Sequence, residues 1–340
     1  MWPIRKSVVV RIALAVMALH LVCAGSAPDA QTPLPQAGSW DSEPIVPIPL
    51  DPDLDAAQVA LGEKLFHDPR LSRNNVFSCA TCHRLNQGGG DGVSRPPTLT
   101  GGLHLRNTPT VFNVSLNSRF HWDGGFRTLE AEAEAAIHDP AIMNTDWADV
   151  LPKLQADADY VNAFNGAYPG GLTRANVLHA LASFERSLTT PNSRFDQYLR
   201  GDAEALSDAE KRGYDLFKSY GCVACHQGVN VGGNMFQRFG IFRNQDRSHE
   251  DDDAGRFSVT GAERDRQVFR VPSLRNVAVT APYYHDGRVQ TLETAVDLMA
   301  TRQLGRPLHP EEIEIIVQFL HTLTGEYQGQ LLTLPGEDEP

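Results

Sequence analysis

Cys79-Ala-Thr-Cys82-His83 and Cys222-Val-Ala-Cys225-His226 are two copies of one pattern, C-x-x-C-H. The pattern is typical of covalent haem attachment: two thiols on one turn bond to the vinyl groups of a porphyrin, and the adjoining His offers a ring nitrogen to the iron. The alternatives are a disulfide, a redox dithiol and half of a zinc site. A redox dithiol needs no His directly after it, and zinc takes four ligands. The only other cysteine is Cys23, so the two copies predict two covalently bound c-type haems.

The composition is that of a globular protein. The chain has 340 residues, of which 41% are hydrophobic and 21% charged, and this length is enough for two domains with a core each. Its 30 Lys and Arg stand against 42 Asp and Glu, a formal net charge of −12, whereas a nucleic-acid-binding protein would show an excess of basic residues. No internal apolar run reaches the roughly 18–20 residues that span a bilayer. We therefore expect no nucleic-acid partner and no membrane span.

The N-terminus has the features of an export signal. Three basic residues come first: Arg5, Lys6 and Arg11. An apolar stretch over residues 12–22 follows, and small residues from 24 to 27 indicate cleavage near Ser26. We expect residues 1–26 to be removed as a signal peptide. Acylation of Cys23 is the alternative, although the valine before it is larger than lipoprotein signals prefer.

Helical patterns precede both haem motifs. Apolar residues at helical spacing predict a helix over Asp55–Phe66, just before the first motif. Ser207 and Glu210 form a capping box that opens a helix through Phe217, just before the second motif. Further helices are expected over Trp147–Leu154, Tyr160–Asn165, Arg174–Leu188 and Pro310–Leu323. The acidic stretch Arg243–Arg256 is interpreted as a solvated surface loop without a site.

These elements predict an all-α fold of two cytochrome c-like domains, each with one covalently attached haem. Helix, short loop, haem motif and long loop follow one another twice, and β-type alternation is scarce. The expected N-terminal domain covers residues 51–194 and the C-terminal domain residues 195–329. An extended lead-in over 27–50, rich in Pro and Ala, and a tail over 330–340 flank them.

Short motifs along the chain resemble a known family. They are Asp68-Pro-Arg-Leu-Ser72, Arg106-Asn-Thr-Pro-Thr-Val-Phe-Asn113, Trp122-Asp-Gly124, Asn192-Ser-Arg-Phe-Asp196, Pro272-Ser-Leu-Arg-Asn276, Thr280-Ala-Pro-Tyr-Tyr-His-Asp-Gly287 and Phe319-Leu-His-Thr-Leu-Thr-Gly325. Each alone is weak, but together with the first haem motif they extend over residues 50–326. In this order they are similar to the bacterial dihaem cytochrome c peroxidases and to their relatives that mature methylamine dehydrogenase.

The resemblance implies a role for each haem. The haem on Cys79 and Cys82, with His83 as proximal ligand, would be the low-potential site where hydrogen peroxide is reduced. The haem on Cys222 and Cys225, with His226 as proximal ligand, would be the high-potential site. That second haem would receive electrons from a small c-type cytochrome or a cupredoxin. Because the family is bacterial and the chain has an export signal, we expect the protein in the periplasm.

Met299 is the expected axial ligand of the second haem. The expected mature chain contains three methionines, Met143, Met235 and Met299, and ligation by His and Met raises the reduction potential of a haem. The residues alone leave Met235 and Met299 nearly equal, since a lone methionine usually fills a core. The resemblance favours Met299, which matches the ligand of the peroxidases. The relatives that mature methylamine dehydrogenase have Tyr at that position.

Two further features rest on the resemblance. Trp122 matches a Trp that lies between the two haems and helps electrons cross, although a packed aromatic residue is the simpler interpretation. Asn107, with the backbone carbonyls of Thr280 and Pro282, matches a calcium site between the domains. Oxygen ligands of this kind suit a hard cation.

The chain departs from the family near the first haem. Where the peroxidases have a loop His that closes the resting iron, this chain has Leu99, and the only His of the loop is His104. Where they have a Gln and a catalytic Glu after Trp-Asp-Gly, this chain has Glu132 and Ile142. Cleavage of the O–O bond needs an acid–base group, and the side chain of Ile142 cannot act as one. Glu132 or His138 is therefore the candidate for that role.

The loss of the loop His predicts an open first haem. Leu99 has no lone pair to offer, so we expect the haem on His83 to be five-coordinate or weakly water-bound in the oxidised protein. The alternative is that His104 or His121 closes the iron, since histidine readily ligates haem.

The sequence therefore predicts a dihaem enzyme that reduces hydrogen peroxide to water. Two alternatives stay open: a dihaem enzyme that oxidises side chains of a partner protein, and an electron-transfer cytochrome without turnover. Ile142 favours the second of these alternatives, because it removes the expected acid–base group. A homodimer is compatible with the sequence.

Overall fold

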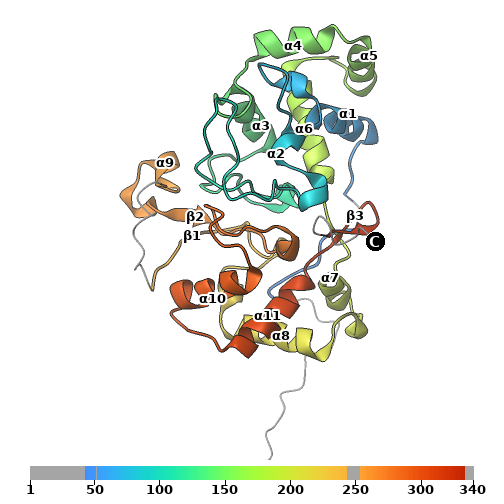
Figure 1. The fold of residues 1–340 in the computed structure, drawn as a ribbon. Helices are drawn as coiled ribbons and strands as arrows, with labels where there is room; N and C mark the ends of the chain where they lie inside the picture. The colour runs from blue at the N-terminus through green and yellow to red at the C-terminus, as the bar shows by residue number, and fades with distance from the viewer. Residues whose placement is uncertain (1–42, 51, 243–252, 334–340) are drawn as a thin grey trace, which may run out of the picture. The chain divides into compact units, whose positions relative to one another are not determined.

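Helices are the main regular secondary structure of the described chain (Figure 1). The computed structural model describes residues 43–50, 52–242 and 253–333. The expected signal peptide with Cys23, most of the lead-in and the end of the tail lie outside the described residues. None of the described helices combines the length and the apolar composition needed to cross a bilayer.

The helices are α1 (Ala56–Phe66), α2 (Cys79–Cys82), α3 (Leu129–His138), α4 (Trp147–Gln155), α5 (Ala158–Ala167), α6 (Arg174–Ser187), α7 (Arg194–Leu199), α8 (Asp208–Ser219), α9 (Phe257–Thr260), α10 (Leu292–Gln303) and α11 (Pro310–His321). Strands are short and form two antiparallel pairs in the described residues: β1 (Phe236–Arg238) with β2 (Val268–Arg270), and β3 (Glu326–Tyr327) with β4 (Gln330–Leu331). In the β1–β2 pair, Phe236 lies opposite Arg270. The expectation of a mostly helical fold is confirmed.

Local capping explains where the helices before the haem motifs begin. The Asp55 side chain accepts hydrogen bonds from the backbone N–H groups of Ala57 and Gln58 at the start of α1. Ser207 and Glu210 form the predicted capping box at the start of α8. Both predicted helices are thus confirmed, and α4, α5, α6 and α11 begin within about two residues of their predicted starts.

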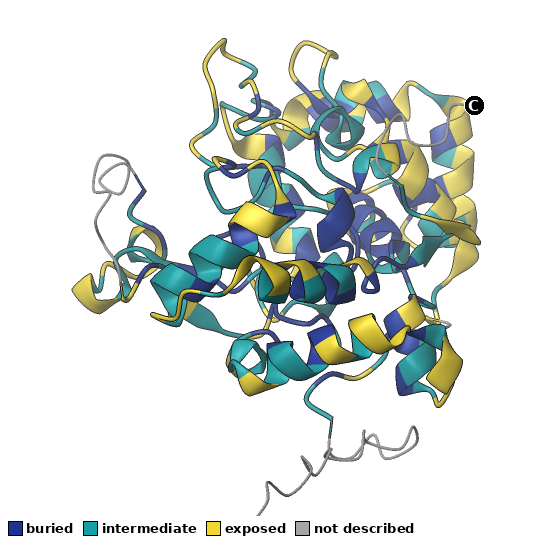
Figure 2. Ribbon diagram, turned by 60° about the horizontal axis from the view of Figure 1, so that its bottom comes forward, coloured by how far each residue is buried: buried dark blue, intermediate teal, exposed yellow. Residues whose placement is uncertain are grey.

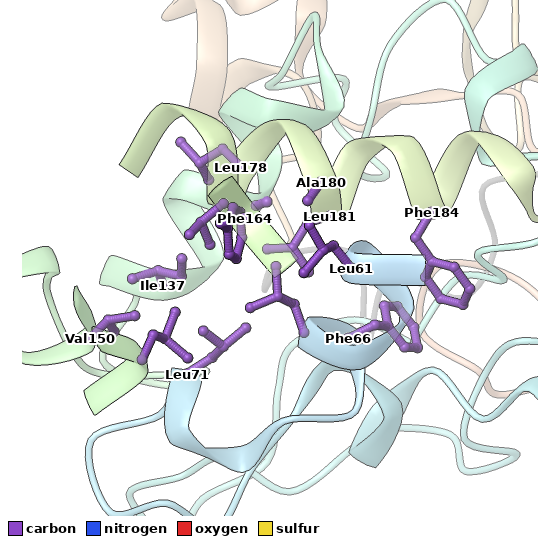
Figure 3. Packing of buried hydrophobic residues seen from close by; sticks show 14 of the residues in the cluster. Leu61, Phe66, Leu71, Ile137, Val150, Phe164, Leu178, Ala180, Leu181 and Phe184 are labelled. Atoms are coloured by element: carbon purple, nitrogen blue, oxygen red, sulfur yellow. The ribbon is translucent and has the colours of Figure 1, made fainter. Parts of the chain in front are cut away.

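A glycine allows α1 to cross α6 closely. A Cβ atom on Gly62 would lie 1.9 Å from the carbonyl oxygen of Ala180, so no larger residue fits there. Beside the crossing, Phe66 of α1 and Phe184 of α6 pack edge to face with ring centroids 5.1 Å apart (Figure 3). The same hydrophobic cluster includes Leu71, Ile137, Val150 and Phe164 (Figure 3). Cys79 packs against this cluster, so the first haem motif is anchored on the α1–α6 pair.

The pair of α8 and α11 repeats this arrangement before the second motif. A Cβ atom on Gly213 would lie 2.3 Å from the carbonyl oxygen of Ile315. Phe217 of α8 packs against Phe319 of α11, with ring centroids 5.3 Å apart. Cys222 packs against the hydrophobic cluster around this pair. In both helices a glycine is followed four residues later by a phenylalanine, and the haem motif comes next.

The helices bury one side and expose the other (Figure 2), as the 3.6-residue period of an amphipathic helix requires. The described residues belong to one compact unit. Their buried hydrophobic side chains gather mainly in two clusters, one around α1 and α6 and one around α8 and α11.

The interpretation of Arg243–Arg256 as a solvated loop is wrong at its C-terminal end. Residues 243–252 lie outside the described residues, but Asp253 is only 6% exposed. Its carboxylate pairs with Arg106, with Oδ2 2.7 Å from Nε. A buried carboxylate needs an opposite charge, and Arg106, which is 147 residues away, supplies it.

Candidate functional site

The first C-x-x-C-H motif forms a single helical turn, α2. Ser78 caps it together with Thr81, and the backbone N–H of His83 donates to the Cys79 carbonyl at 2.9 Å. This turn brings Cys79, Cys82 and His83 to the wall of one cavity of about 400 Å³, which we call the first cavity. Two thiols and an imidazole thus meet at one hollow, as a haem attachment site requires.

The second motif makes the same turn in 3₁₀ form over Cys222–Ala224. The backbone N–H of His226 donates to the Cys222 carbonyl at 2.9 Å. Cys222, Cys225 and His226 line another cavity of about 240 Å³, the second cavity. Met299 of α10 lines this cavity too, whereas Met235 lines neither cavity.

Both histidines are oriented by a backbone carbonyl. The Nδ1 atom of His83 lies 3.3 Å from the Gly89 oxygen, and that of His226 lies 3.3 Å from the Val231 oxygen. This bond fixes the ring and leaves Nε2 for a metal, as in many metal-ligating histidines. Burial lowers the pKa of His83, and it lowers the pKa of His226 to about 4. Both rings are therefore neutral at pH 7, which is the form that binds iron.

The four thiols are free and partly buried, and they line the two cavities. Burial raises the pKa of Cys79 and Cys225, and it raises the pKa of Cys82 and of Cys222 to about 11. A redox dithiol has a lowered thiol pKa, so this environment argues against that alternative. Unpaired thiols beside a neutral His are compatible with a covalently attached haem. The residues of the two C-x-x-C-H motifs therefore fit two haems, one in each cavity.

Trp122 lies between the two haem motifs. It is 9% exposed and lines both cavities. Its Nε1 donates to the backbone oxygen of Asn107 at 2.9 Å, and the backbone N–H of Asn107 donates to the oxygen of His285 at 2.7 Å. The Trp122 and His285 rings are 6.4 Å apart between centroids. This chain of contacts connects the segments that line the two cavities.

The three residues expected at a calcium site, Asn107, Thr280 and Pro282, all line the second cavity. Asn107 is buried, and its Nδ2 donates to the Val93 oxygen at 2.7 Å. An amide whose nitrogen is engaged presents its oxygen to other partners. A side-chain amide oxygen and backbone carbonyls are ligands that fit a hard cation.

Glu132 of α3 lines the first cavity, and Ile142 lines it as well. Glu132 Oε1 lies 2.8 Å from Nε2 of His121, another residue of this cavity. Burial alone would raise the pKa of Glu132, but the hydrogen bond and charge of His121 outweigh it and lower that pKa. The same bond raises the pKa of His121 against the effect of burial. The carboxylate is therefore ionised at neutral pH and held in place by an imidazole.

The other candidates near the first haem take different positions. His138 is 44% exposed, lies 3.4 Å from Glu134 and does not line the first cavity. His104 lines that cavity, and Leu99 does not. The backbone N–H of Leu99 donates to the Ala141 oxygen at 2.9 Å.

Three residues of the first cavity are His121, Glu185 and Arg270. The sequence interpretation considered His121 only as a ligand that could close the iron, and it gave Glu185 and Arg270 no role. Burial and the negative charge of Glu132 raise the pKa of Glu185 well above its ordinary range. His121 directly precedes the Trp-Asp-Gly motif, and this position was the one signal that pointed to it. Glu185 and Arg270 lie in an ordinary helical pattern and in a short strand, which carry no such signal.

Comparisons with known proteins agree with this geometry. Residues 56–204 match the family described as di-haem cytochrome c peroxidase. Cytochrome c peroxidase Ccp of Escherichia coli (strain K12) is 43% identical over 288 residues, which are 84% of this chain and 62% of that protein, less than two thirds of its length. Cytochrome c551 peroxidase of Pseudomonas aeruginosa is 42% identical over 275 residues, 79% of either chain.

A solved structure has the same fold. The crystal structure of a MauG-like protein associated with microbial copper homeostasis superimposes with a TM-score of 0.73 at 29% identity, covering 84% of this chain and 94% of that chain. The P. aeruginosa relative is 42% identical to this chain over 79% of either chain, and the first haem motif lies within the residues that match the family. The chain therefore belongs to the dihaem cytochrome c peroxidase family, whose members are oxidoreductases.

Proposed function

We propose that the protein is a periplasmic peroxidase, which reduces hydrogen peroxide to two molecules of water with two electrons and two protons. The observation that carries this proposal is that each C-x-x-C-H motif lines its own cavity while Trp122 lines both. The names of the E. coli and P. aeruginosa relatives support peroxide as the substrate. The export signal expected at residues 1–26 supports the periplasm.

Each haem would be held by one motif. Cys79 and Cys82 would bond to the first haem and Cys222 and Cys225 to the second, with His83 and His226 as proximal ligands. Met299 would be the sixth ligand of the second haem, since it lines that cavity and Met235 does not. When bound, the haems supply the electron transfer and the cleavage of the O–O bond, while the protein supplies ligands, orientation and protons.

Electrons would enter at the second haem from a small c-type cytochrome or a cupredoxin. The name of the P. aeruginosa relative, a cytochrome c551 peroxidase, favours a c-type cytochrome as the donor. Trp122 would then lie on the route to the first haem, because it lines both cavities and is buried.

Glu132 would handle the proton in the first cavity. Its carboxylate is ionised and held at Oε1 by His121 Nε2, so it can accept a proton from peroxide and return it to the departing oxygen. We assign this role to Glu132 and not to His138, whose side chain is 44% exposed and lies away from the cavity.

Two domains and a calcium ion complete the proposal. Residues 51–194 and 195–329 would each form a cytochrome c-like domain with one haem, and the repeated helix pairs α1–α6 and α8–α11 support this division. A calcium ion on Asn107, Thr280 and Pro282 would connect the two; the presence of all three in the lining of the second cavity supports this site.

Ile142 favours a second candidate function. It lines the first cavity where the peroxidases have a catalytic Glu, so slow turnover would suit a dihaem enzyme that oxidises side chains of a partner protein. The fold shared with a MauG-like protein agrees with this alternative. A cytochrome without turnover is the remaining alternative, and Ile142 favours it as well, because it removes the expected acid–base group.

Peroxide consumption by the haem-loaded protein with a reduced small c-type cytochrome tests these functions. We expect steady turnover, and we expect Glu132→Gln to lower kcat about 10²- to 10⁴-fold. The matched control is Glu134→Gln, two residues further along α3 and outside both cavities. Absence of turnover in the wild type would leave the electron-transfer cytochrome or the partner-oxidising enzyme. Mass spectrometry of the denatured protein should find two haem additions, and one addition or a Cys–Cys bridge would contradict the assignment of both motifs.

A further inference from the structure

Arg270 is a buried guanidinium that bonds only to uncharged groups in the described chain. It ends β2 and is 6% exposed. Its Nε donates to the backbone oxygen of His121 at 3.2 Å, and its Nη1 donates to Oδ1 of Asn117 at 3.1 Å. Neither acceptor carries a charge, and Nη2 has no hydrogen-bond partner among the described residues. The cation is thus held in place without being neutralised.

Two other arginines show the usual solution to a buried positive charge. Arg275, which is 1% exposed at its side chain, pairs with Asp196 at 2.8 Å. Arg106 pairs with Asp123 and with Asp253, at 2.6 and 2.7 Å. An unpaired buried charge is strongly destabilising, and arginine does not escape by losing its proton at neutral pH. Burial lowers the pKa of Arg270 to about 10, which still leaves it charged. Arg270 therefore lacks a counter-ion among the residues that the structure describes.

The position of Arg270 indicates where that counter-ion belongs. Arg270 lines both the first and the second cavity, as Asn117 and Trp122 do. A haem brings two propionate carboxylates into each cavity, and a carboxylate matches the planar fork of a guanidinium. The residues that orient the guanidinium, His121 and Asn117, use Nε and Nη1 and leave Nη2 toward other partners.

We propose that Arg270 binds a propionate carboxylate of a haem seated in one of these two cavities and thereby raises the reduction potential of that haem. Neutralising a propionate removes a negative charge that would otherwise favour the ferric iron. The two haems offer the same chemistry, so the experiment must tell which one supplies the carboxylate. The proposal rests on haem binding and not on peroxide turnover, so the two can fail separately.

Redox titration of the haem-loaded protein, followed by absorption, tests the proposal. Arg270→Gln removes the charge and keeps a polar side chain. We expect it to shift the reduction equilibrium of the bound haem about tenfold toward the ferric form, which is about 59 mV for a one-electron couple. The matched control is Arg256→Gln, which removes a nearby arginine that contacts the oxygens of Asp123 and Gly124 and lines neither cavity.

The outcomes separate the two sources of the carboxylate. A shift of the His83 haem alone assigns the propionate to the first haem, a shift of the His226 haem alone assigns it to the second, and a shift of both shows that Arg270 serves both. If neither haem shifts further than in Arg256→Gln, the proposal is overturned. Should Arg270→Gln fail to fold, Arg270→Lys is the variant that decides. A lysine ammonium cannot make two parallel hydrogen bonds to a carboxylate, so the propionate bending band in the resonance Raman spectrum must move. An unchanged band would overturn the proposal.

Discussion

Single side chains decide how each haem iron is ligated, and Met299 is the clearest case. It lies on α10 and lines the second cavity together with His226. A thioether favours the ferrous iron, so Met299→Ala should lower the potential of that haem, by on the order of 0.1 V. The band that reports charge transfer between Met and iron should disappear as well. A redox titration and a near-infrared spectrum of the haem-loaded variant measure both effects.

Met235 provides the control for this prediction. Its backbone oxygen accepts a hydrogen bond from the Val271 N–H, and its side chain lines neither cavity. Met235→Ala should leave the potential and the charge-transfer band nearly unchanged. If the two variants exchange their effects, Met235 is the ligand and Met299 fills space.

The resting state of the first haem depends on which histidines reach it. Leu99 lies outside the first cavity, and of the two other candidates that line it, His121 is held at Nε2 by Glu132, at 2.8 Å. We therefore expect the oxidised haem on His83 to be high-spin and to react with peroxide without prior reduction. Ferric optical and electron spin resonance spectra check this. A low-spin bis-His signal that vanishes in His104→Ala or in His121→Ala would show instead that this histidine closes the iron.

Residues of the site differ in how far the sequence could predict them. Each haem motif occupies five consecutive residues, so a single turn suffices to bring two thiols and an imidazole together. Glu132 could be matched to a family position, but its partner His121 lies on a loop that only the fold brings to α3. Arg270 reaches both cavities because β2 pairs with β1 and bonds to the segment around Trp122. No local pattern carries that information.

Among the elements, the close crossing of α8 and α11 makes a direct prediction. A Cβ atom on Gly213 would lie 2.3 Å from the Ile315 carbonyl oxygen, a backbone atom that cannot move aside alone. Gly213→Ala should therefore lower the free energy of unfolding by about 1–3 kcal/mol, as overpacking does. Denaturant unfolding of the haem-loaded protein measures it.

Gly166 in α5 offers a matched control for this substitution. It is exposed, and a Cβ atom there would have no heavy atom within 4 Å. Since glycine in a helix costs more backbone entropy than alanine, Gly166→Ala should raise the stability by about 0.5–1 kcal/mol. Equal effects of both substitutions would mean that helix propensity, and not the crossing, governs the result.

The elements were predictable where local signals were strong. Asp55 and the Ser207 capping box marked the starts of α1 and α8. In contrast, α3 and α10 were not anticipated. The buried residues of α3 are Leu129, Ala133 and Ile137, and an alanine at the centre of the buried face gives little hydrophobic contrast. The packing of α3 against α6, which uses that small residue, is a tertiary feature.

For the molecule as a whole, one ion-pair cluster ties distant parts of the chain together. Arg106 bonds to Asp123 and to Asp253. Arg106 and Asp123 are next in sequence to Asn107 and Trp122, which are in contact and line both cavities. The acidic composition around Asp253 indicated solvent, because a local pattern cannot reveal a partner 147 residues away. Loss of this cluster should therefore affect overall stability and not a local loop alone.

Asp253→Asn tests the cluster through its pH dependence. Burial alone would raise the pKa of Asp253, but the hydrogen bonds and charge of Arg106 outweigh it and lower that pKa. A lowered pKa in the folded state stabilises the protein above the unfolded value, about 3.9, and this stabilisation is lost as the pH falls through the folded pKa. At pH 7 the free energy of unfolding of the variant should be lower than that of the wild type by about 1–3 kcal/mol. The loss should not be larger, because Arg106 still forms its ion pair with Asp123.

The difference in free energy of unfolding between the wild type and Asp253→Asn, measured with denaturant, should accordingly be largest near pH 7. This gap should become smaller as the solution is made more acidic than pH 4, since protonated Asp253 resembles asparagine. Glu263→Gln is the control: Glu263 is 75% exposed at its side chain and pairs with Arg266 on the surface, so its loss should cost less than about 1 kcal/mol. A gap that stays constant with pH, or an equal cost for both variants, would mean that the Arg106–Asp253 pair does not hold these two distant parts of the chain together.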